Sequence, residues 1–398
     1  MRRRILQLVA VFAVLVALIL LLKFTGAEQT RAADSGTKSF GVKTPWGEPD
    51  LQGIWTDEYQ TPLQRPAKFA GKELFTDEER AALDAQRAAI DLRPRGEKGS
   101  ERDVAGAYNQ VYMSIKRTGR RTSLIVDPPD GRIPPLTSEI RKQMAADREY
   151  QLALMQATAT CKNQEAGCRG GKYGPPSPLR EGVPPRYSTA NINRVDNPED
   201  RSMSERCMSA VLPDFTGFRR IVQSQGTVSI FYDVGQGQGW QRIIPINGSS
   251  HLPSYVRQRF GDSRGHWEGE TLVVDVTNFS PKSDFMGSRE NRHLVERWTR
   301  TGPSTLEYSV TIEDPSTWAK PWTVKQEYSR QSDQANRIYY EPRCHDGNFG
   351  LPGLLAGGRA TEKAFAEGRG PNPATLDNVK GMDAPDDNTD PLQGAPAP

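Results

Sequence analysis

Residues 305–313 read TLEYSVTIE, a segment in which polar and apolar side chains alternate. The apolar positions are Leu306, Tyr308, Val310 and Ile312. Successive side chains of a β-strand point to opposite faces, so a period of two predicts a strand with one buried face. Other parts of the chain must cover that face, and the neighbouring segments predict further strands that could do so.

Further short segments rich in β-branched and aromatic residues surround this strand, separated by turn residues. They are residues 218–223, 227–234, 241–246, 271–276, 293–299, 322–331 and 338–341. Segment 271–276 is the most apolar, which predicts a central strand with Val273 and Val274 buried. Strands that follow one another without intervening helices pair antiparallel. The predicted fold class is therefore mainly β, an antiparallel β-barrel or sandwich, and about eight strands is a lipocalin-like number.

The N-terminal half predicts helical and loop-rich additions to this sheet. A capping box, Thr76 to Glu79, starts a helix expected to end near residue 92. A second helix is expected at 138–157. Between them, a short strand at 122–126 should stop at the turn sequence PPDG of residues 128–131. The Gly- and Pro-rich residues 159–200 should be loop.

The two ends of the chain differ in composition from its middle. Three arginines precede an apolar run at residues 5–22, which is the pattern of an export signal. The run also reaches the length of a membrane-spanning helix, so a cleaved signal peptide and a retained inner-membrane anchor both fit. In either case we expect a periplasmic or secreted protein. The predicted divisions are a signal peptide or anchor at 1–34, a region at 35–200 with an N-terminal strand at 50–55, two helices and Pro- and Gly-rich loops, an antiparallel β domain at 201–356 and a disordered tail at 357–398.

Charge and cysteine content limit the partners and the compartment. The formal net charge is +3 over 398 residues, without a clustered basic face, so nucleic acid is not an expected partner. Four cysteines in an exported chain make disulfides the default, and they allow three pairings. We expect Cys207 to pair with Cys344, at the margins of the strand region. Cys161 and Cys168 would then close a small loop.

All four histidines lie in one stretch of the C-terminal half, as His251, His266, His293 and His345. A histidine paired with a carboxylate can transfer protons near neutral pH without a cofactor. The predicted catalytic centre therefore combines His293 or His345 with a carboxylate from Asp262, Glu268, Glu296 or Asp346. On a strand, His293 and Glu296 point to opposite faces. Separate structural histidines are the alternative interpretation.

A ligand pocket is the second kind of site that these residues favour. The aromatic wall would be Trp240, Trp267, Trp298 and Tyr308, with His251 and Arg264 as polar anchors. The alternative interpretation is structural, with Asp262 and Arg264 capping a turn and Trp267 in the core. Zinc held by His251, His293 and His345 is a third interpretation, but their spacing carries no metal signature. We therefore predict no metal, and no cofactor motif is present.

Several motifs together suggest a family. They are DLQGIW at 50–55, TPLQRP at 61–66, DPPDGRIP at 127–134, GDSRGHWEGETLVVD at 261–275, NF at 278–279, HLVER at 293–297 and CH at 344–345. They cover most of residues 45–355 and resemble a family of exported bacterial proteins, most of them uncharacterised. The resemblance implies export and no particular activity. Gly53-Ile54-Trp55 is also similar to the Gly-x-Trp of the first lipocalin strand, although only three residues match.

The leading functional prediction is an exported protein that binds a hydrophobic or aromatic small molecule in a β-barrel pocket. Two alternatives stay open. One is a cofactor-independent lyase, isomerase or hydrolase that uses a histidine–carboxylate pair. The other is a structural envelope protein. A pocket lined by histidines favours the enzyme, an apolar pocket favours the binder, and a filled barrel favours the structural protein.

Overall fold

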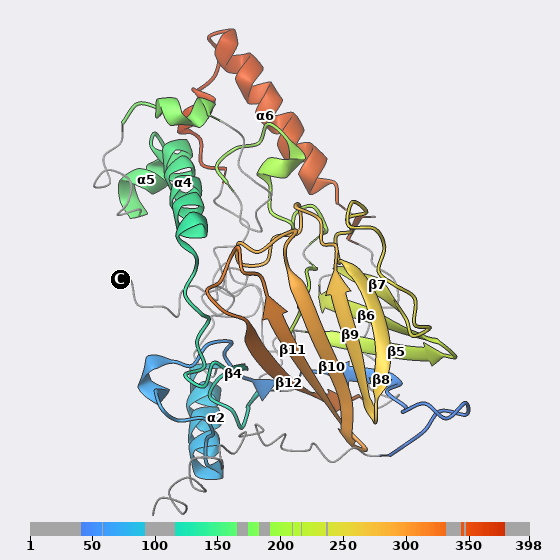
Figure 1. Ribbon diagram of the computed structural model, residues 1–398. Coiled ribbons are helices and arrows are strands. Elements are labelled where there is room, and N and C mark those ends of the chain that lie inside the picture. The colour runs from blue at the N-terminus through green and yellow to red at the C-terminus, as the bar shows by residue number, and fades with distance from the viewer. Residues whose placement is uncertain are drawn as a thin grey trace, which may run out of the picture. The chain divides into compact units, whose positions relative to one another are not determined.

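One antiparallel sheet organises the protein (Figure 1). The computed structural model describes residues 41–57, 59–91, 116–164, 174–182, 192–208, 210–215, 217–235, 238–331, 344–345 and 348–378. The ten strands are β1 (Gly53–Thr56), β4 (Ile125–Asp127), β5 (Phe218–Ser224), β6 (Thr227–Gly235), β7 (Gln238–Pro245), β8 (Asp262–Glu268), β9 (Thr271–Thr277), β10 (His293–Gly302), β11 (Thr305–Glu313) and β12 (Trp322–Arg330). Their order is β7-β6-β5-β1-β12-β11-β10-β9-β8, and β4 also pairs with β12.

The two edge strands of this sheet, β7 and β8, meet each other and nearly close it into a barrel. Arg242 of β7 donates from Nε to Ser263 Oγ of β8 at 2.8 Å. A Cβ at Gly265 would lie only 2.9 Å from Ile244 Cγ2, so glycine is what lets the two edges approach. The predicted antiparallel, barrel-like β fold is confirmed.

The alternation read from the sequence divides the sheet into an inner and an outer face. On β11, Leu306, Tyr308, Val310 and Ile312 are all buried in the core. On β9, Leu272, Val274 and Val276 point inward, and Val273 is buried on the opposite face. The predicted burial of Val273 and Val274 is confirmed. Large aromatic rings fill much of the interior, among them Trp55, Trp298, Trp322 and Tyr328.

The strand predicted at residues 50–55 is present as β1, whereas one further strand, β8, was not predicted. Strand β1 comes from the N-terminal region but lies between β5 and β12, so that region completes the sheet instead of lying apart from it. Strand β8 occupies the polar motif at 262–268, whose sequence does not predict a strand. Its inward residues include Ser263 and Gly265, which carry no apolar signal. The strand predicted at 338–341 lies outside the described residues.

The helices are α2 (Asp77–Asp91), α4 (Ser138–Met155), α5 (Ala159–Gln164) and α6 (Gly350–Ala366). The capping box of α2 is present, with Thr76 N donating to Glu79 Oε2 at 2.8 Å and Glu79 N to Thr76 Oγ1 at 3.2 Å. Helix α5 and two short 3-10 turns occupy parts of the region predicted as loop. A small parallel pair joins β2 (Tyr59–Gln60) to β3 (Arg117–Thr118).

Helix α6 corrects the prediction of disorder from residue 357. Its first turns are rich in leucine and glycine. Arg359 donates to Asp196 O at 2.9 Å, which attaches the helix to a distant segment.

Among the described residues, no helix combines the length and hydrophobicity needed to cross a membrane. The predicted signal or anchor at 5–22 lies outside them.

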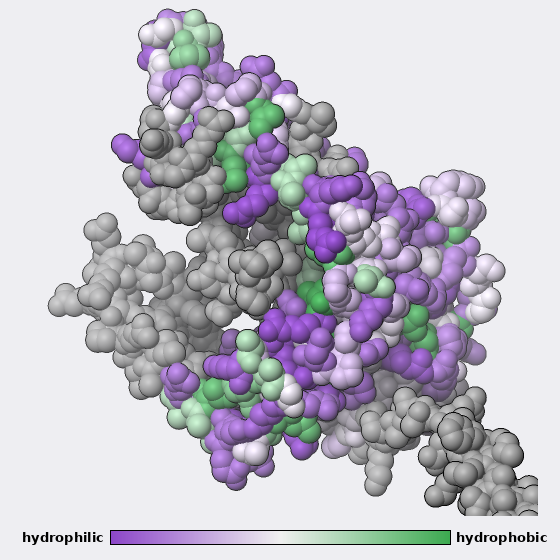
Figure 2. All heavy atoms as spheres, turned by 60° about the vertical axis from the view of Figure 1, so that its left-hand side comes forward, coloured by the Kyte–Doolittle hydropathy of each residue, from purple (hydrophilic) through white to green (hydrophobic). Residues whose placement is uncertain are grey.

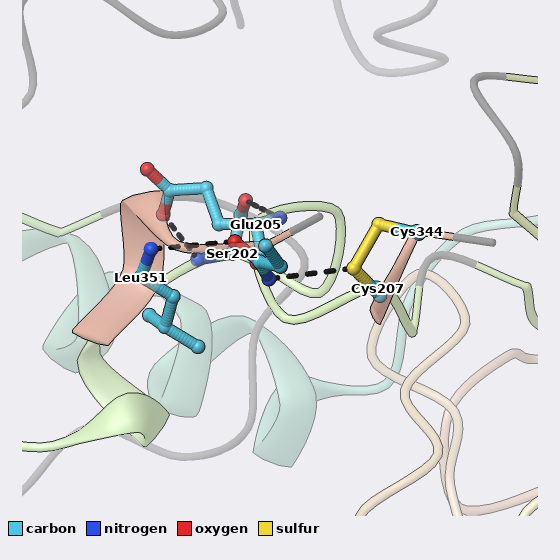
Figure 3. The surroundings of a disulfide bond; sticks show 6 residues. Ser202, Glu205, Cys207, Cys344 and Leu351 are labelled. Atoms are coloured by element: carbon cyan, nitrogen blue, oxygen red, sulfur yellow. Dashed lines mark hydrogen bonds between the residues drawn. A yellow bond between two sulfur atoms is a disulfide. The ribbon is translucent and has the colours of Figure 1, made fainter. Parts of the chain in front are cut away.

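The predicted bond between Cys207 and Cys344 is present (Figure 3), with the two Cα atoms 5.6 Å apart. Asn348 donates from Nδ2 to Glu205 O at 2.7 Å and to Cys207 Sγ at 3.3 Å. These contacts tie the start of α6 to the segment before the sheet. Cys161 is also disulfide-bonded, and Cys168, its expected partner, lies outside the described residues.

Candidate functional site

Charged side chains gather on the outer face of four neighbouring strands. Their positions follow from strand alternation: Asp262 and Arg264 on β8, Asp275 on β9, His293 on β10 and Glu313 on β11. Each lies opposite in phase to the residues of its own strand that face the barrel core. The sheet therefore brings together groups that are up to 51 residues apart in the sequence.

Asp275 lies at the centre of this group and bridges two histidines. Its Oδ2 is 2.8 Å from His293 Nε2, and its Oδ1 is 2.8 Å from His251 Nε2. The other nitrogen of His293, Nδ1, lies 3.4 Å from Glu313 Oε2. None of these three histidine–carboxylate pairs was predicted from the sequence, because Asp275 and Glu313 carry no local signal that links them to a histidine.

Asp262 extends the chain of contacts behind His251. Its Oδ2 lies 2.9 Å from His251 Nδ1 and also accepts from Leu252 N at 2.9 Å. Its Oδ1 accepts from Arg264 Nη1 at 2.7 Å. We call the six residues Glu313, His293, Asp275, His251, Asp262 and Arg264 the outer relay. Asp262 and Arg264 therefore help to build a charged site, beyond the turn-capping role considered for them.

The outer relay shifts the titration of two of its members. The hydrogen bond with Asp275 raises the pKa of His293, against the effect of partial burial, and Glu313 contributes in the same direction. The pKa of Asp275 is lowered, first by the hydrogen bond from His293 and also by His251. The pair therefore favours an imidazolium beside a carboxylate.

This geometry can support acid–base chemistry at one atom. Asp275 fixes the His293 ring through Nε2, which leaves Nδ1 with only the long contact to Glu313. The Glu313 side chain is 52% exposed, so water and small molecules can compete with it. A carboxylate that orients one histidine nitrogen while the other faces a ligand is the arrangement of many proton-transfer sites.

Glu296, predicted as a catalytic carboxylate, lies on the other side of the sheet. It is completely buried, pairs with Arg242 Nη1 at 2.6 Å and accepts from Tyr308 OH at 2.7 Å. Burial would lower the pKa of Arg242, but Glu296 and Tyr232 hold it above its ordinary value. The prediction that Glu296 acts with a histidine is therefore wrong, because β10 turns His293 outward and Glu296 inward.

The predicted ligand pocket does not form as one site. Trp240, Trp298 and Tyr308 lie inside the barrel, whereas His251 and Arg264 lie on its outer face. Trp298 and Tyr308 are 0% and 1% exposed, and their rings pack 4.2 Å apart. A side chain that lines an open pocket keeps accessible surface, so these two residues act as core. Trp267 is half-buried against that core.

The barrel interior nevertheless contains polar atoms that lack partners. Within the described part of the chain, no hydrogen bond is made by Trp240 Nε1, Trp298 Nε1, Tyr328 OH or Arg242 Nη2. Trp298 packs against Tyr308 and Tyr328, and Arg242 donates to Tyr232 OH at 3.2 Å. Several unpaired donors therefore cluster in one region, and each buried unpaired donor is destabilising by about 1–3 kcal/mol.

The remaining predicted site residues lie elsewhere. His266 is exposed on the outer face of β8 and contacts Glu268 at 3.2 Å, and Arg297 also pairs with that glutamate. His345 is exposed beside the Cys207–Cys344 bond and, in the described residues, forms no hydrogen bond with the other three histidines. Asp346 lies outside the described residues. The zinc interpretation finds no support, because no group of three or more His, Cys, Asp or Glu side chains in the described ranges could hold a metal ion.

Comparisons with known proteins add little. No protein-family model and no curated protein matches the chain. Among solved structures, a variant of the fluorescent protein UnaG is 16% identical over 29% of this chain and 72% of its own, with a TM-score of 0.19. Secretory abundant heat soluble protein 4 from Ramazzottius varieornatus is 14% identical over 29% and 69%, also with a TM-score of 0.19. At that TM-score neither similarity supports a conclusion about this chain.

Proposed function

We propose that this protein is exported, binds a small molecule on the outer face of its barrel and exchanges a proton with it through His293. The observation that carries the proposal is the asymmetry of the His293 ring. Nε2 lies 2.8 Å from Asp275, whereas Nδ1 has only a 3.4 Å contact with exposed Glu313. A ligand atom that accepts a hydrogen bond can replace Glu313 without disturbing Asp275.

The proposed chemistry is that of a cofactor-independent lyase, isomerase or hydrolase. His293 would donate or accept the proton, and Asp275 would orient the ring and stabilise its charged form. The ligand needs an acceptor or an exchangeable proton, such as a carboxylate, a carbonyl or a phenol. The charged groups of the outer relay fit a polar ligand better than a large apolar one. The face of the molecule drawn in Figure 2 is mainly hydrophilic among its coloured residues.

Export is part of the proposal for two reasons. The disulfide between Cys207 and Cys344 is typical of oxidising compartments outside the cytoplasm. The basic and apolar N-terminal pattern and the resemblance to exported bacterial proteins point the same way. A structural envelope role remains the outcome if no ligand is found.

The test is to follow the ring nitrogens of His293 by NMR while small carboxylates, carbonyl compounds and phenols are added one at a time. His266 is a matched control, because it lies on the same outer face and contacts a carboxylate, Glu268, that is half-exposed. We expect at least one compound to shift His293 Nδ1 and to leave His266 unchanged. A His293→Gln variant should lose that binding and keep a nearly unchanged melting temperature. Equal shifts at both histidines, or none at His293, would refute the proposal.

Binding inside the barrel is a second candidate, favoured by the unpaired donors around Trp298 and Tyr328. An aromatic molecule with several oxygen acceptors would satisfy them, but the packed interior would have to open to admit it. The Tyr328→Phe variant distinguishes the cases, because it removes only the hydroxyl. If Tyr328 OH has no partner in solution, the variant should be as stable as the parent or more so. If a guest holds the hydroxyl, stability and any co-purified molecule should both be lost.

A further inference from the structure

The segment between β7 and β8, residues 246–261, is attached to the barrel mainly by polar contacts. We call it the connector. Its ends are anchored by apolar packing, since Ile246 packs on the core and Phe260 stacks on Trp240 with ring centres 3.5 Å apart. Between these ends, residues 247–250 and 252–255 are exposed, and Tyr255 is 83% exposed. We call residues 247–255 the middle of the connector, and His251 is the one partly buried residue among them.

His251 attaches the middle of the connector to two strands at once. Its Nδ1 contacts Asp262 of β8 at 2.9 Å, and its Nε2 contacts Asp275 of β9 at 2.8 Å. The backbone on both sides of His251 is also bound to β8. Leu252 N donates to Asp262, and Ser250 O accepts from Arg264 at 2.8 Å. Asn278 supplies a contact that does not depend on protonation, from Nδ2 to Leu252 O at 2.8 Å.

The protonation state of the imidazole ring decides whether His251 can donate both of these hydrogen bonds. A neutral histidine carries one N–H and one lone pair, whereas the protonated ring carries two N–H donors. Only the protonated ring can donate to both Asp262 and Asp275. After the proton is lost, one nitrogen lone pair faces a carboxylate oxygen at under 3 Å, which is repulsive. The charged groups around His251 are Asp262 and Arg264 of β8 and Asp275 of β9, followed by His293 of β10 and Glu313 of β11.

We propose that His251 is a proton-dependent clamp that holds the connector against the outer relay and controls the geometry of Asp275 beside His293. With the clamp closed, Asp275 has both oxygens engaged and the His293 ring is fixed. With the clamp open, the exposed middle of the connector moves away and Asp275 loses one of its two histidines. The control of ligand binding rests on the proposed function of His293. The clamp itself does not.

Hydrogen exchange of the Leu252 amide tests the clamp in the whole protein without a ligand. Its protection factor, which is corrected for the intrinsic pH dependence of exchange, should fall about tenfold as the pH is raised and the His251 ring loses one of its two N–H donors. The Gln258 amide is an internal reference, because it donates to Asn278 O at 2.9 Å and to no carboxylate. Its protection should stay constant over the same range.

Two variants assign the effect to His251. His251→Gln should show low Leu252 protection at every pH, because a glutamine amide cannot bridge the two carboxylates as a cation does. His266→Gln, the matched control on the same outer face, should keep the parent response. A protection factor of the Leu252 amide that does not change with pH in the parent would overturn the clamp. A full pH response in His251→Gln would overturn it as well. His293→Gln should also keep the response, so that a failed clamp and a failed ligand site give different results.

Discussion

Asp275 and His293 meet diagonally across the β9–β10 pair, with Oδ2 2.8 Å from Nε2. In the strand register Asp275 lies opposite Val295, so the contact spans two positions on the outer face. The register of the two strands, and not the spacing along the chain, therefore creates the central pair of the site. The following variants test this pair and the packing behind it.

Replacing Asp275 with Asn should lower the pKa of His293, since the hydrogen bond with Asp275 is the main cause of its raised value. NMR titration of the His293 ring measures this directly. The raised pKa also predicts a pH dependence of stability. The contribution is complete below the ordinary histidine pKa of about 6.5 and is lost as pH rises through the folded value.

The free energy of unfolding should therefore fall over that range in the parent and less in His293→Gln. The effect should be small, because the His293 side chain is about one-third exposed and solvent screens the interaction. Parallel pH–stability curves for the two proteins would show that His293 has no stabilising partner.

On the inner face, Glu296→Gln should be strongly destabilising. The change leaves Arg242 buried without its carboxylate, and breaking such a pair typically lowers the free energy of unfolding by about 3–5 kcal/mol. Urea unfolding measures the change. Glu313→Gln is the control on the outer face and should stay within about 0.5 kcal/mol of the parent. Similar values for the two variants would contradict the assignment of faces.

The core position of Val274 predicts a clear loss on truncation. Val274→Ala should reduce the free energy of unfolding by about 1–3 kcal/mol, because a fully buried side chain leaves a cavity. Val222→Ala on β5 is the matched control, since that valine is 47% exposed, and it should change stability by less than about 0.5 kcal/mol. Equal losses would mean that the strand does not face the core.

Removing the disulfide should destabilise the whole fold. Cys207 and Cys344 are 137 residues apart, and a loop of that length restricts the unfolded chain strongly. The double variant Cys207→Ser with Cys344→Ser should lose about 2–5 kcal/mol in equilibrium unfolding. Alkylation and mass spectrometry of the parent should find neither thiol free. A free thiol in the folded parent would refute the pairing.

Local sequence patterns were enough to predict most of the elements. The period of two at 305–313 predicted β11 to the residue, and the capping box at Thr76 predicted the start of α2. These signals depend on side chains only a few residues apart, whose relative positions are set by the local backbone. Strand β8 was not predicted because Ser263 and Gly265, which face inward beside Trp267, are too small to produce an apolar period.

The site depended on contacts that no local pattern encodes. The sequence pointed to His293, His251 and Asp262, but only the register of the strands and the fold of the connector brought Asp275 between the two histidines. The separation of Glu296 from His293, in contrast, follows from the alternation of side chains along β10. Periodicity determines which face a side chain occupies. Which side chains meet on that face is decided by pairing between distant strands, and hence by the tertiary structure alone.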